Sequence, residues 1–322
     1  MSIIVTGGTG FVGLALAEAL GKSGKDCVLF GRTPIPARFE DDFPAAVSVI
    51  GDICNSEHVD MLFDETPLES VVHLAAVTPD TQAEMTDPAG IIGVNVGGIA
   101  NVMRSLSRFA CRPRLVLVSS VAVYGNDKSS AEIFSEDDAT LKPVSLYGIT
   151  KLAAENAALR LAELYGIDLR IVRLGPLFGP WEYSTGLRPV LSPHAQVLEV
   201  WKNGTDAILP RPLVADWLYS RDAARGLAAI LNADRLLHSS YNLGGGVLTS
   251  VADWCAGLQS SPFARGWRVA QSGEEPNIQF GLARDRAALG MQRITAETDF
   301  RILYTGSRVI EDYLAWMTAT TA

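Results

Sequence analysis

The sequence has 322 residues, 48% of them apolar and 20% charged, which is an ordinary composition for a globular protein of one large or two modest domains. The formal net charge of −9 argues against nucleic acid or an anionic membrane as a partner, because both favour a basic surface. No apolar run reaches ~18 residues and the chain enters a strand-like run at once, so we expect a cytoplasmic protein without a membrane span.

Short apolar runs rich in β-branched residues alternate with longer helical patterns through the first half of the chain. We expect strands at Ser2–Thr6, Cys27–Phe30, Val47–Ile50, Val71–Ala75, Leu115–Ser119 and Leu169–Leu174. We expect helices at Phe11–Leu20, Ser56–Phe63, Pro88–Phe109 and Leu146–Tyr165. This alternation predicts an α/β fold with a Rossmann-type, doubly wound parallel sheet that helices cover on both faces.

The composition of the sequence changes after Leu174. Residues 175–215 are rich in Pro and Gly with aromatic residues between them, as expected of a pocket built from loops. A helix near Arg221–Leu231 and a strand at Tyr241–Leu243 rejoin the first layer, and the tail carries short helices that end in Ser307–Met317. We therefore predict a dinucleotide-binding domain over residues 1–174, rejoined by about 216–245, and a smaller C-terminal α/β substrate domain over 175–215 and 246–322.

A glycine-rich loop, TGGTGFVG, follows the first strand and opens the first helix. Gly7, Gly10 and Gly13 are spaced G-x-x-G-x-x-G, and Gly8, Gly10 and Gly13 also fit G-x-G-x-x-G. Without Cβ atoms the chain can turn tightly, and its N–H groups can approach a pyrophosphate at the positive end of the helix. The strand–loop–helix setting favours a dinucleotide site over a purely structural turn.

The end of the second strand bears on which dinucleotide is bound. An acidic residue there would hold the 2′-hydroxyl of NAD, but this strand is followed by Gly31-Arg32-Thr33. Arg32 could pair with a 2′-phosphate, so NADP is favoured and NAD remains possible. The alternative is that Arg32 is a solvated arginine at a strand end.

The segment SLYGITK places Tyr147 four residues before Lys151, on one face of the predicted helix. A free tyrosine has a pKa near 10 and is a poor base at neutral pH, whereas a nearby ammonium favours the phenolate. The pair could therefore transfer protons, or it could be an exposed pair without function. The spacing alone does not decide between them.

Nine segments taken together favour a proton-transfer role for Tyr147 and Lys151. They are TGGTGFVG (6–13), GDI (51–53), HLAA (73–76), NVGG (95–98), SSVAVYG (119–125), YGITK (147–151), RLGPLFGP (173–180), DWLYSRDAA (216–224) and YNLGGG (241–246). In this order the chain resembles the extended short-chain dehydrogenase/reductase family, the NAD(P)-dependent sugar epimerases, dehydratases and reductases. The resemblance covers most of the chain. It implies a Rossmann-type domain, a smaller substrate domain and hydride transfer with a nicotinamide cofactor.

The resemblance also implies roles for single residues. Ser120 would orient the reacting oxygen, Tyr147 would transfer its proton, and Lys151 would lower the pKa of Tyr147 and bond the nicotinamide ribose. The implied cofactor contacts are the glycine loop with Phe11 and Val12, then Asp52 and Ile53 at the adenine, Ala75 and Ala76 beside the cofactor backbone, and Asn95 as a brace. Asn95 could equally be an ordinary polar residue at a helix end. The resemblance further implies a homodimer that pairs through the two long helices, residues 88–109 and 146–165.

Two departures from the family pattern narrow the function. Val121 and Ala122 stand where 4,6-dehydratases carry an Asp-Glu pair, so water elimination is disfavoured. Ala215 stands where many members carry an arginine that clamps a diphosphate; Arg211, Arg188 and Arg221 are the alternatives for that role. Within the variable segment we choose Tyr183 and Arg188 as substrate residues.

These observations predict an NAD(P)-dependent oxidoreductase or epimerase that acts on a secondary alcohol or ketone of a small sugar-like substrate. One alternative is a nucleotide-sugar epimerase that works through a transient ketone. Another is a non-catalytic dinucleotide-binding regulator. The four cysteines, Cys27, Cys54, Cys111 and Cys255, and the four histidines are scattered, so we expect neither a disulfide framework nor a metal site.

Overall fold

The computed structural model describes residues 1–110, 113–125, 133–137, 140–184, 190–282 and 284–321. Its central element is a seven-stranded sheet in which every pair of neighbouring strands is parallel, as predicted. In spatial order the strands are β12 (Ser240–Leu243), β7 (Leu169–Leu174), β5 (Arg114–Ser120), β4 (Leu68–His73), β1 (Ser2–Thr6), β2 (Cys27–Gly31) and β3 (Ala46–Ile50).

The strand sequences are apolar throughout because both faces of the sheet are covered. On β1, Ile3 and Val5 belong to one buried apolar cluster and Ile4 belongs to another. Alternate residues of a strand point to opposite faces, so these two clusters are the two cores of the layered fold. All three side chains are at most 1% exposed.

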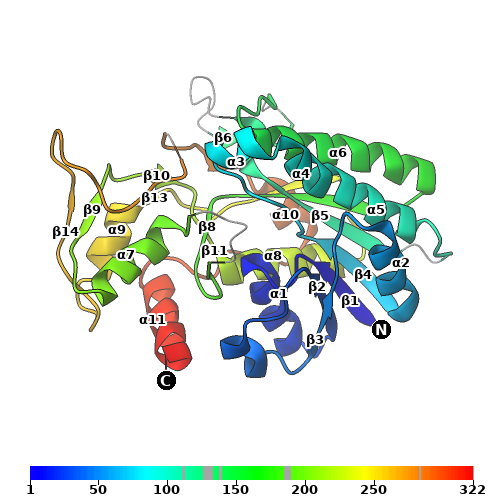
Figure 1. Cartoon of the computed structure of the whole chain (residues 1–322), viewed down its shortest axis with the longest axis horizontal. Coiled ribbons are helices and arrows are strands. Elements are labelled where there is room, and N and C mark those ends of the chain that lie inside the picture. Colours follow the sequence, from blue (N-terminus) through cyan, green and yellow to red (C-terminus); the bar gives the residue numbers. More distant parts are fainter. Residues whose placement is uncertain (111–112, 126–132, 138–139, 185–189, 283, 322) are drawn as a thin grey trace.

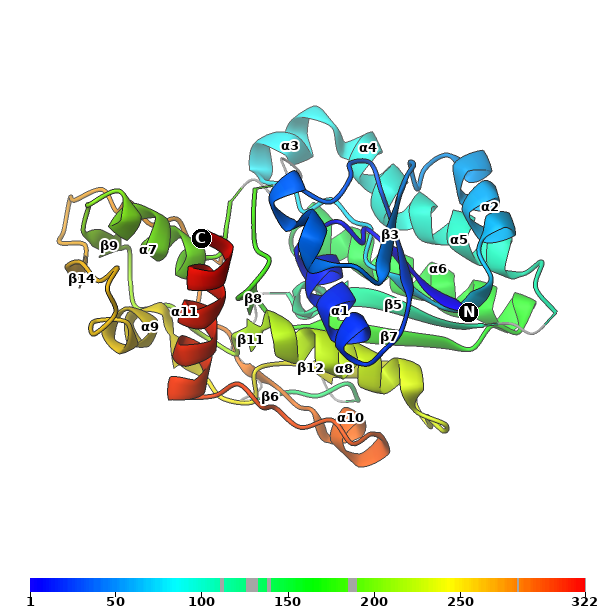
Figure 2. The same ribbon diagram turned by 90° about the horizontal axis from the view of Figure 1, so that it is seen from below.

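The helices form a layer on each face of this sheet (Figures 1 and 2). One face carries α1 (Phe11–Lys22) and α8 (Ser220–Asn232), whose apolar residues share a cluster. The other face carries α2 (Ser56–Glu65), α5 (Gly98–Leu106) and α6 (Leu146–Tyr165). The Rossmann-type doubly wound fold is thereby confirmed.

The helix predicted over Pro88–Phe109 is a continuous helical segment that ends at Leu106 and contains a π turn. The segment consists of α4 (Pro88–Ile92), a π-helical turn (Gly93–Gly97) and α5, and it follows the short helix α3 (Thr81–Thr86). A π turn inserts one extra residue and re-aims the side chains within it, a feature that often occurs at functional sites. Here the turn contains Asn95.

The C-terminal half contributes a smaller layer beside the sheet (Figure 1). Three helices, α7 (Pro193–Lys202), α9 (Val251–Gly257) and α11 (Ser307–Thr321), enclose a third apolar cluster that includes Trp201 and Trp254. The remaining helix, α10 (Gln292–Glu297), packs on the sheet side against α8 and β12. The predicted boundary at residue 174 stays a prediction.

Short strand pairs connect these parts. They are β8 (Leu177–Phe178) with β11 (Leu218–Tyr219), β9 (Ala207–Leu209) with β14 (Trp267–Val269), β10 (Val214–Ala215) with β13 (Thr249–Ser250), and β6 (Ile133–Phe134) with β15 (Ala288–Leu289). A half-buried ion-pair group links three helices across the junction, because Arg221 on α8 binds Glu18 on α1 at 2.6 Å and Asp312 on α11 at 2.6 Å.

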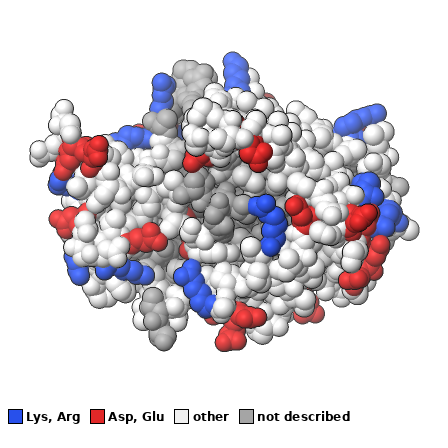
Figure 3. Space-filling model, viewed as in Figure 1, with Lys and Arg blue, Asp and Glu red and all other residues white. Residues whose placement is uncertain are grey.

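The surface in Figure 3 carries acidic and basic side chains interspersed, and they do not gather into one continuous patch on this face. Among the described residues, no helix combines the length and the apolar character needed to cross a membrane.

Candidate functional site

A small pocket lies at the carboxyl ends of β1, β2 and β4, where parallel sheets usually bind ligands. Its volume is about 70 Å³. Six of the residues predicted to contact a cofactor line it together, although they are spread over 70 positions of the sequence. These are Gly7, Arg32, Asp52, Ile53, Ala75 and Ala76.

The glycine loop holds its shape because Gly7 has no side chain. Gly7 has a φ of +67°, and a Cβ there would lie 2.7 Å from the backbone nitrogen of Ala75. The loop and the segment after β4 therefore pass in direct backbone contact. Gly13 is packed against the loop in the same way, since a Cβ at this position would lie 2.3 Å from the carbonyl oxygen of Gly8.

The first helix begins at this loop without a capping side chain. Gly10 is the N-cap residue, no side chain accepts a hydrogen bond from the first turn, and no acidic residue lies in that turn. Phe11 and Val12 are half-buried at its start. The positive end of the helix dipole is therefore directed at the loop, the arrangement that binds phosphate groups.

Arg32 and Asp52 mark two sides of the pocket. Arg32 is exposed just beyond β2. The Oδ1 atom of Asp52 accepts a hydrogen bond of 2.8 Å from the backbone N–H of Cys54, which orients this carboxylate at the pocket. Ile53 is buried and is packed so closely on α5 that a Cβ at Gly98 would lie 3.0 Å from its side chain.

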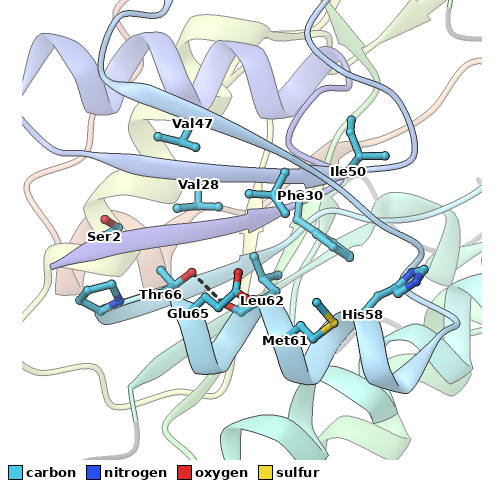
Figure 4. A pocket seen from close by; sticks show the side chains of 12 residues that line it. Ser2, Val28, Phe30, Val47, Ile50, His58, Met61, Leu62, Glu65 and Thr66 are labelled. Carbon is cyan, nitrogen blue, oxygen red and sulfur yellow. Dashed lines mark hydrogen bonds between the residues drawn. The ribbon is translucent and has the colours of Figure 1, made fainter.

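A larger groove lies beside this pocket, between β3 and α2 (Figure 4). Its volume is about 260 Å³. Val28, Val47 and Ile50 line its strand side, and Met61 lines its helix side. The lining is mainly apolar and contains none of the predicted site residues, so the smaller pocket is the candidate cofactor site.

Tyr147 and Lys151 lie on successive turns at the start of α6. The side chain of Ser145 caps this helix by accepting a hydrogen bond from Gly148 N at 3.2 Å. The Nζ atom of Lys151 lies 5.9 Å from the centre of the Tyr147 ring and donates to the carbonyl oxygen of Val118 on β5 at 2.8 Å. The amine is therefore bonded to β5 and lies near the phenol ring.

Burial changes the acid–base behaviour of this amine. Burial lowers the pKa of Lys151 from 10.5 to about 8, while Glu155 one turn later acts in the opposite direction. His73 at the end of β4 bonds Thr6 through Nδ1 at 2.8 Å. Burial, with the charge of Lys151 as the second cause, lowers the pKa of His73 to about 3, so this imidazole is neutral.

Ser120 is the last residue of β5 and caps the short turn Val121–Tyr124. Its Oγ accepts a hydrogen bond of 3.1 Å from the backbone N–H of Ala122. Because this contact uses an oxygen lone pair, the hydroxyl proton of Ser120 remains available for donation. A Cβ at Gly148 would lie 2.7 Å from the Ala122 carbonyl oxygen, so the first turn of α6 packs directly on this turn.

Asn95 connects two parts of the site from the π turn. Its Oδ1 accepts from the N–H of Val77 at 2.8 Å, and its Nδ2 donates to Val77 O at 3.1 Å and to Thr150 Oγ1 at 3.0 Å. Thr150 in turn donates to the carbonyl oxygen of Tyr147 at 3.0 Å. Asn95 thus joins the segment after β4 to the helical turn that carries Tyr147, which is the geometry of a brace.

Arg286 is a candidate that our sequence analysis missed. Its backbone N–H donates to Val214 O at 3.1 Å, and the following Ala287 packs with Val121 beside the turn after Ser120. Burial lowers the pKa of the Arg286 guanidinium, and the nearby Tyr147 acts in the opposite direction. The sequence carried no signal for it, because Arg286 is brought to the site from 139 residues beyond Tyr147 by the pairing of β15 with β6.

The other arginines considered for an anionic group have different positions. Arg221 binds Glu18 and Asp312, and Arg211 binds Asp285 and the carbonyl oxygen of Leu282. Arg188 lies outside the described residues, so its assignment stays a prediction.

Tyr183 lies against the glycine loop. Its hydroxyl donates to the carbonyl oxygen of Thr9 at 2.5 Å, and its ring contacts Phe39. This contact gives no support for a substrate role, which stays a prediction. Trp181 and His194, from the same variable segment, are buried among other aromatic side chains.

Two known proteins are similar to this chain in sequence. UDP-glucuronate 4-epimerase 6 of Arabidopsis thaliana is 28% identical over 245 residues, or 72% of this chain and 51% of that protein. The dTDP-glucose 4,6-dehydratase of Escherichia coli is 24% identical over 271 residues, or 76% of this chain and 72% of that protein. The chain thus spans about half the length of the first of these relatives.

The fold is similar to that of a solved structure. The UDP-glucuronic acid 4-epimerase from Bacillus cereus, solved in complex with UDP-glucuronic acid and NAD, has a TM-score of 0.79. It is 20% identical, and the match covers 99% of each chain. The model of the NAD dependent epimerase/dehydratase family matches residues 3–244, about three quarters of the sequence. The chain belongs to the NAD-dependent epimerase/dehydratase family.

Proposed function

We propose that the protein is an NAD-dependent epimerase of a nucleotide-linked sugar, which oxidises a secondary alcohol to a ketone and then reduces the ketone from its other face. The observation that carries this proposal is the buried Lys151 amine, held beside the Tyr147 ring and bonded to the strand that ends in Ser120. The UDP-glucuronate 4-epimerases among the relatives support the substrate class.

In the proposed mechanism, Tyr147 removes the proton of the sugar hydroxyl and returns it after reduction. The positive charge of Lys151 favours the phenolate of Tyr147, which makes it a usable base near neutral pH. Ser120 donates its hydroxyl proton to the reacting oxygen and holds it beside the phenol. The pocket lined by Gly7, Asp52 and Ala75 would hold NAD, which would supply reversible hydride acceptance for the sugar carbon without net redox change.

A dehydratase reaction fits this site less well. Elimination of water needs an acid and a base close to the reacting carbons. Val121 and Ala122, which follow Ser120, have no ionisable group, and Val121 is buried in an apolar cluster with Leu289. We therefore propose that the ketone is reduced again before water is lost.

The anionic portion of the substrate would be held by Arg286. This arginine lies in the segment that packs beside the Ser120 turn, and its guanidinium interacts electrostatically with Tyr147. Ala215 leaves the β10 position without an arginine, so a cation from this other segment is needed if the substrate carries a diphosphate.

For the cofactor we propose NAD, as the family description and the Bacillus cereus complex name it. The comparisons give no support for the preference for NADP that Arg32 suggested. A thermal-shift titration decides between the two: if the exposed Arg32 is only solvated, NAD should raise the melting temperature at least as much as NADP at equal concentration. A larger rise with NADP, lost in Arg32→Ala, would restore the Arg32 argument.

We also propose that the protein is a homodimer. Ile92, Ile149, Leu159 and Leu164, on α4 and α6, are at least 40% exposed and give this side of the molecule an apolar surface. Sedimentation velocity measures this directly: a single species at the 34.5 kDa monomer mass over micromolar concentrations contradicts the proposal.

The substrate class is tested with a panel of UDP-glucuronic acid, UDP-glucose, dTDP-glucose and the free sugar acids. Each is incubated with protein and NAD, the products are separated, and absorbance is followed at the reduced-nicotinamide band. We expect an epimer from a nucleotide sugar without net reduction of NAD. Net reduction would indicate a dehydrogenase, and turnover of a free sugar acid alone would exclude a nucleotide substrate.

A further inference from the structure

A buried ion pair lies directly behind the Tyr147–Lys151 pair. Glu155 follows Lys151 by one turn of α6, and Arg173 lies on β7. The Nε atom of Arg173 donates to Glu155 Oε1 at 3.0 Å and its Nη2 donates to Oε2 at 2.7 Å. The two side chains are 2% and 7% exposed, so the pair is removed from water.

The same guanidinium also reaches the turn that follows Ser120. Its Nη1 donates to the hydroxyl of Tyr124 at 2.9 Å, and Tyr124 donates to Asn242 Oδ1 on β12 at 2.8 Å. Tyr124 is the last residue of the turn that Ser120 caps. Arg173 therefore contacts α6 through Glu155 and the Ser120 turn through Tyr124, using separate nitrogen atoms for the two contacts.

Burying the Glu155–Arg173 ion pair costs desolvation free energy, which a purely structural role does not explain well. Removing two charges from water is expensive, and apolar residues in place of a buried ion pair are often as stable or more stable. A buried pair therefore suggests a use beyond stability. Here the carboxylate lies next to a buried amine that has to carry a positive charge to favour the Tyr147 phenolate.

We propose that Glu155 and Arg173 are positioning residues: Glu155 keeps the Lys151 amine charged, and Arg173 holds that carboxylate in place and fixes helix α6 to the turn that follows Ser120. This inference rests on the proposed function. In the folded protein the negative charge of Glu155 opposes the desolvation of Lys151, and the two-point contact with Arg173 keeps the carboxylate from swinging onto the amine. Lys151 thereby stays both protonated and directed at Val118 and Tyr147.

Three other ionisable groups, Tyr147, His73 and Arg286, lie on or near the first two turns of α6. Tyr147 lies on the same helix, and His73 on β4 is neutral because its pKa is lowered to about 3 by burial and by Lys151. Arg286 approaches Tyr147 from the segment before β15. Among the described residues, Glu155 is the carboxylate that raises the pKa of Lys151, so its removal should have a defined sign.

The test is a direct titration of Lys151 by NMR in the full-length protein labelled at the lysine side chains. The chain has six lysines, and Lys151→Met assigns the signal. We expect Glu155→Gln to lower the titration midpoint of Lys151 by about one pH unit, because the opposing negative charge is lost. We expect Arg173→Lys to raise it, since the less firmly held carboxylate can turn toward the amine.

Arg114→Met is the matched control. Arg114 begins β5 and pairs at 2.8 Å with Asp168, which directly precedes β7. This pair lies at the ends of β5 and β7 opposite to Ser120 and Arg173, so its loss costs stability without touching the site. It should lower the melting temperature and leave the Lys151 midpoint unchanged. Midpoints that do not move, or that move in the same direction, in Glu155→Gln and Arg173→Lys overturn the inference.

Two features keep the test decisive. If Glu155→Gln does not fold, the direction of the shift in Arg173→Lys alone decides, and a fall or no change contradicts the inference. The titration needs neither substrate nor turnover. A failure of the proposed function, seen as normal turnover in Tyr147→Phe, is therefore distinguishable from a failure of this inference.

Discussion

Replacing Tyr147 by Phe should lower turnover by about a thousandfold, because the reacting oxygen loses the group that takes and returns its proton. The ring remains, so the packing of α6 and the position of Lys151 beside Val118 should be kept. The dissociation constant for NAD should change by less than about threefold. Steady-state rates and a binding titration of the same preparation measure the two quantities.

Tyr165→Phe is the control for this variant. Tyr165 lies at the other end of α6, half-buried against the apolar cluster on that face of the sheet. Loss of its hydroxyl should leave turnover close to that of the wild type. Near-normal turnover in Tyr147→Phe would remove Tyr147 as the proton-transfer group, and equal losses in both variants would point to a general effect on the helix.

Replacing Gly7 by Ala should weaken NAD binding by at least about a hundredfold. Two costs add up at this position: a positive φ, which costs an L-residue about 1–2 kcal/mol, and a Cβ placed 2.7 Å from Ala75 N. Relief of that contact has to move the glycine loop or the segment after β4, and both line the proposed cofactor pocket. Calorimetric titration with NAD measures the loss.

Gly24→Ala separates the two costs. Gly24 has a φ of +72°, close to that of Gly7, and nothing lies within 4 Å of the position of its Cβ. The variant should lose a similar amount of stability from backbone strain and still bind NAD normally. If Gly7→Ala also bound NAD normally, the loop would be a structural turn rather than a phosphate-binding one.

The local pattern of the sequence was sufficient for most of the fold. The bounds of β1 and β7 were predicted to the residue, because apolar runs of that length between helical patterns fit only strands buried on both faces. Helix α6 was also predicted over its full length, with Gly166 in the left-handed conformation that ends it. The π turn was missed, and the bonds that its Asn95 makes with Val77, 18 residues away, are not visible in a local pattern.

The candidate site was predictable to the extent that its residues belong to motifs. The glycine loop, Ser120, Tyr147 and Lys151 stand in recognisable segments, and the structure brings the loop together with Arg32, Asp52 and Ala75 at one pocket. The residues found only in the structure act across the fold. Arg173 and Arg286 reach the site through strand pairing and side-chain bonds, which leave no periodic trace in the sequence.

The central claim is that a hydride leaves the sugar and returns to it within one turnover, while Tyr147 handles the proton. The most direct measurement is a single-turnover reaction of the NAD-loaded protein with the nucleotide sugar identified by the panel, followed at the reduced-nicotinamide band. We expect a transient rise that decays as the epimer forms, and no rise in Tyr147→Phe. A permanent rise equal to the substrate consumed, or epimer formed at an equal rate by Tyr147→Phe, would contradict it.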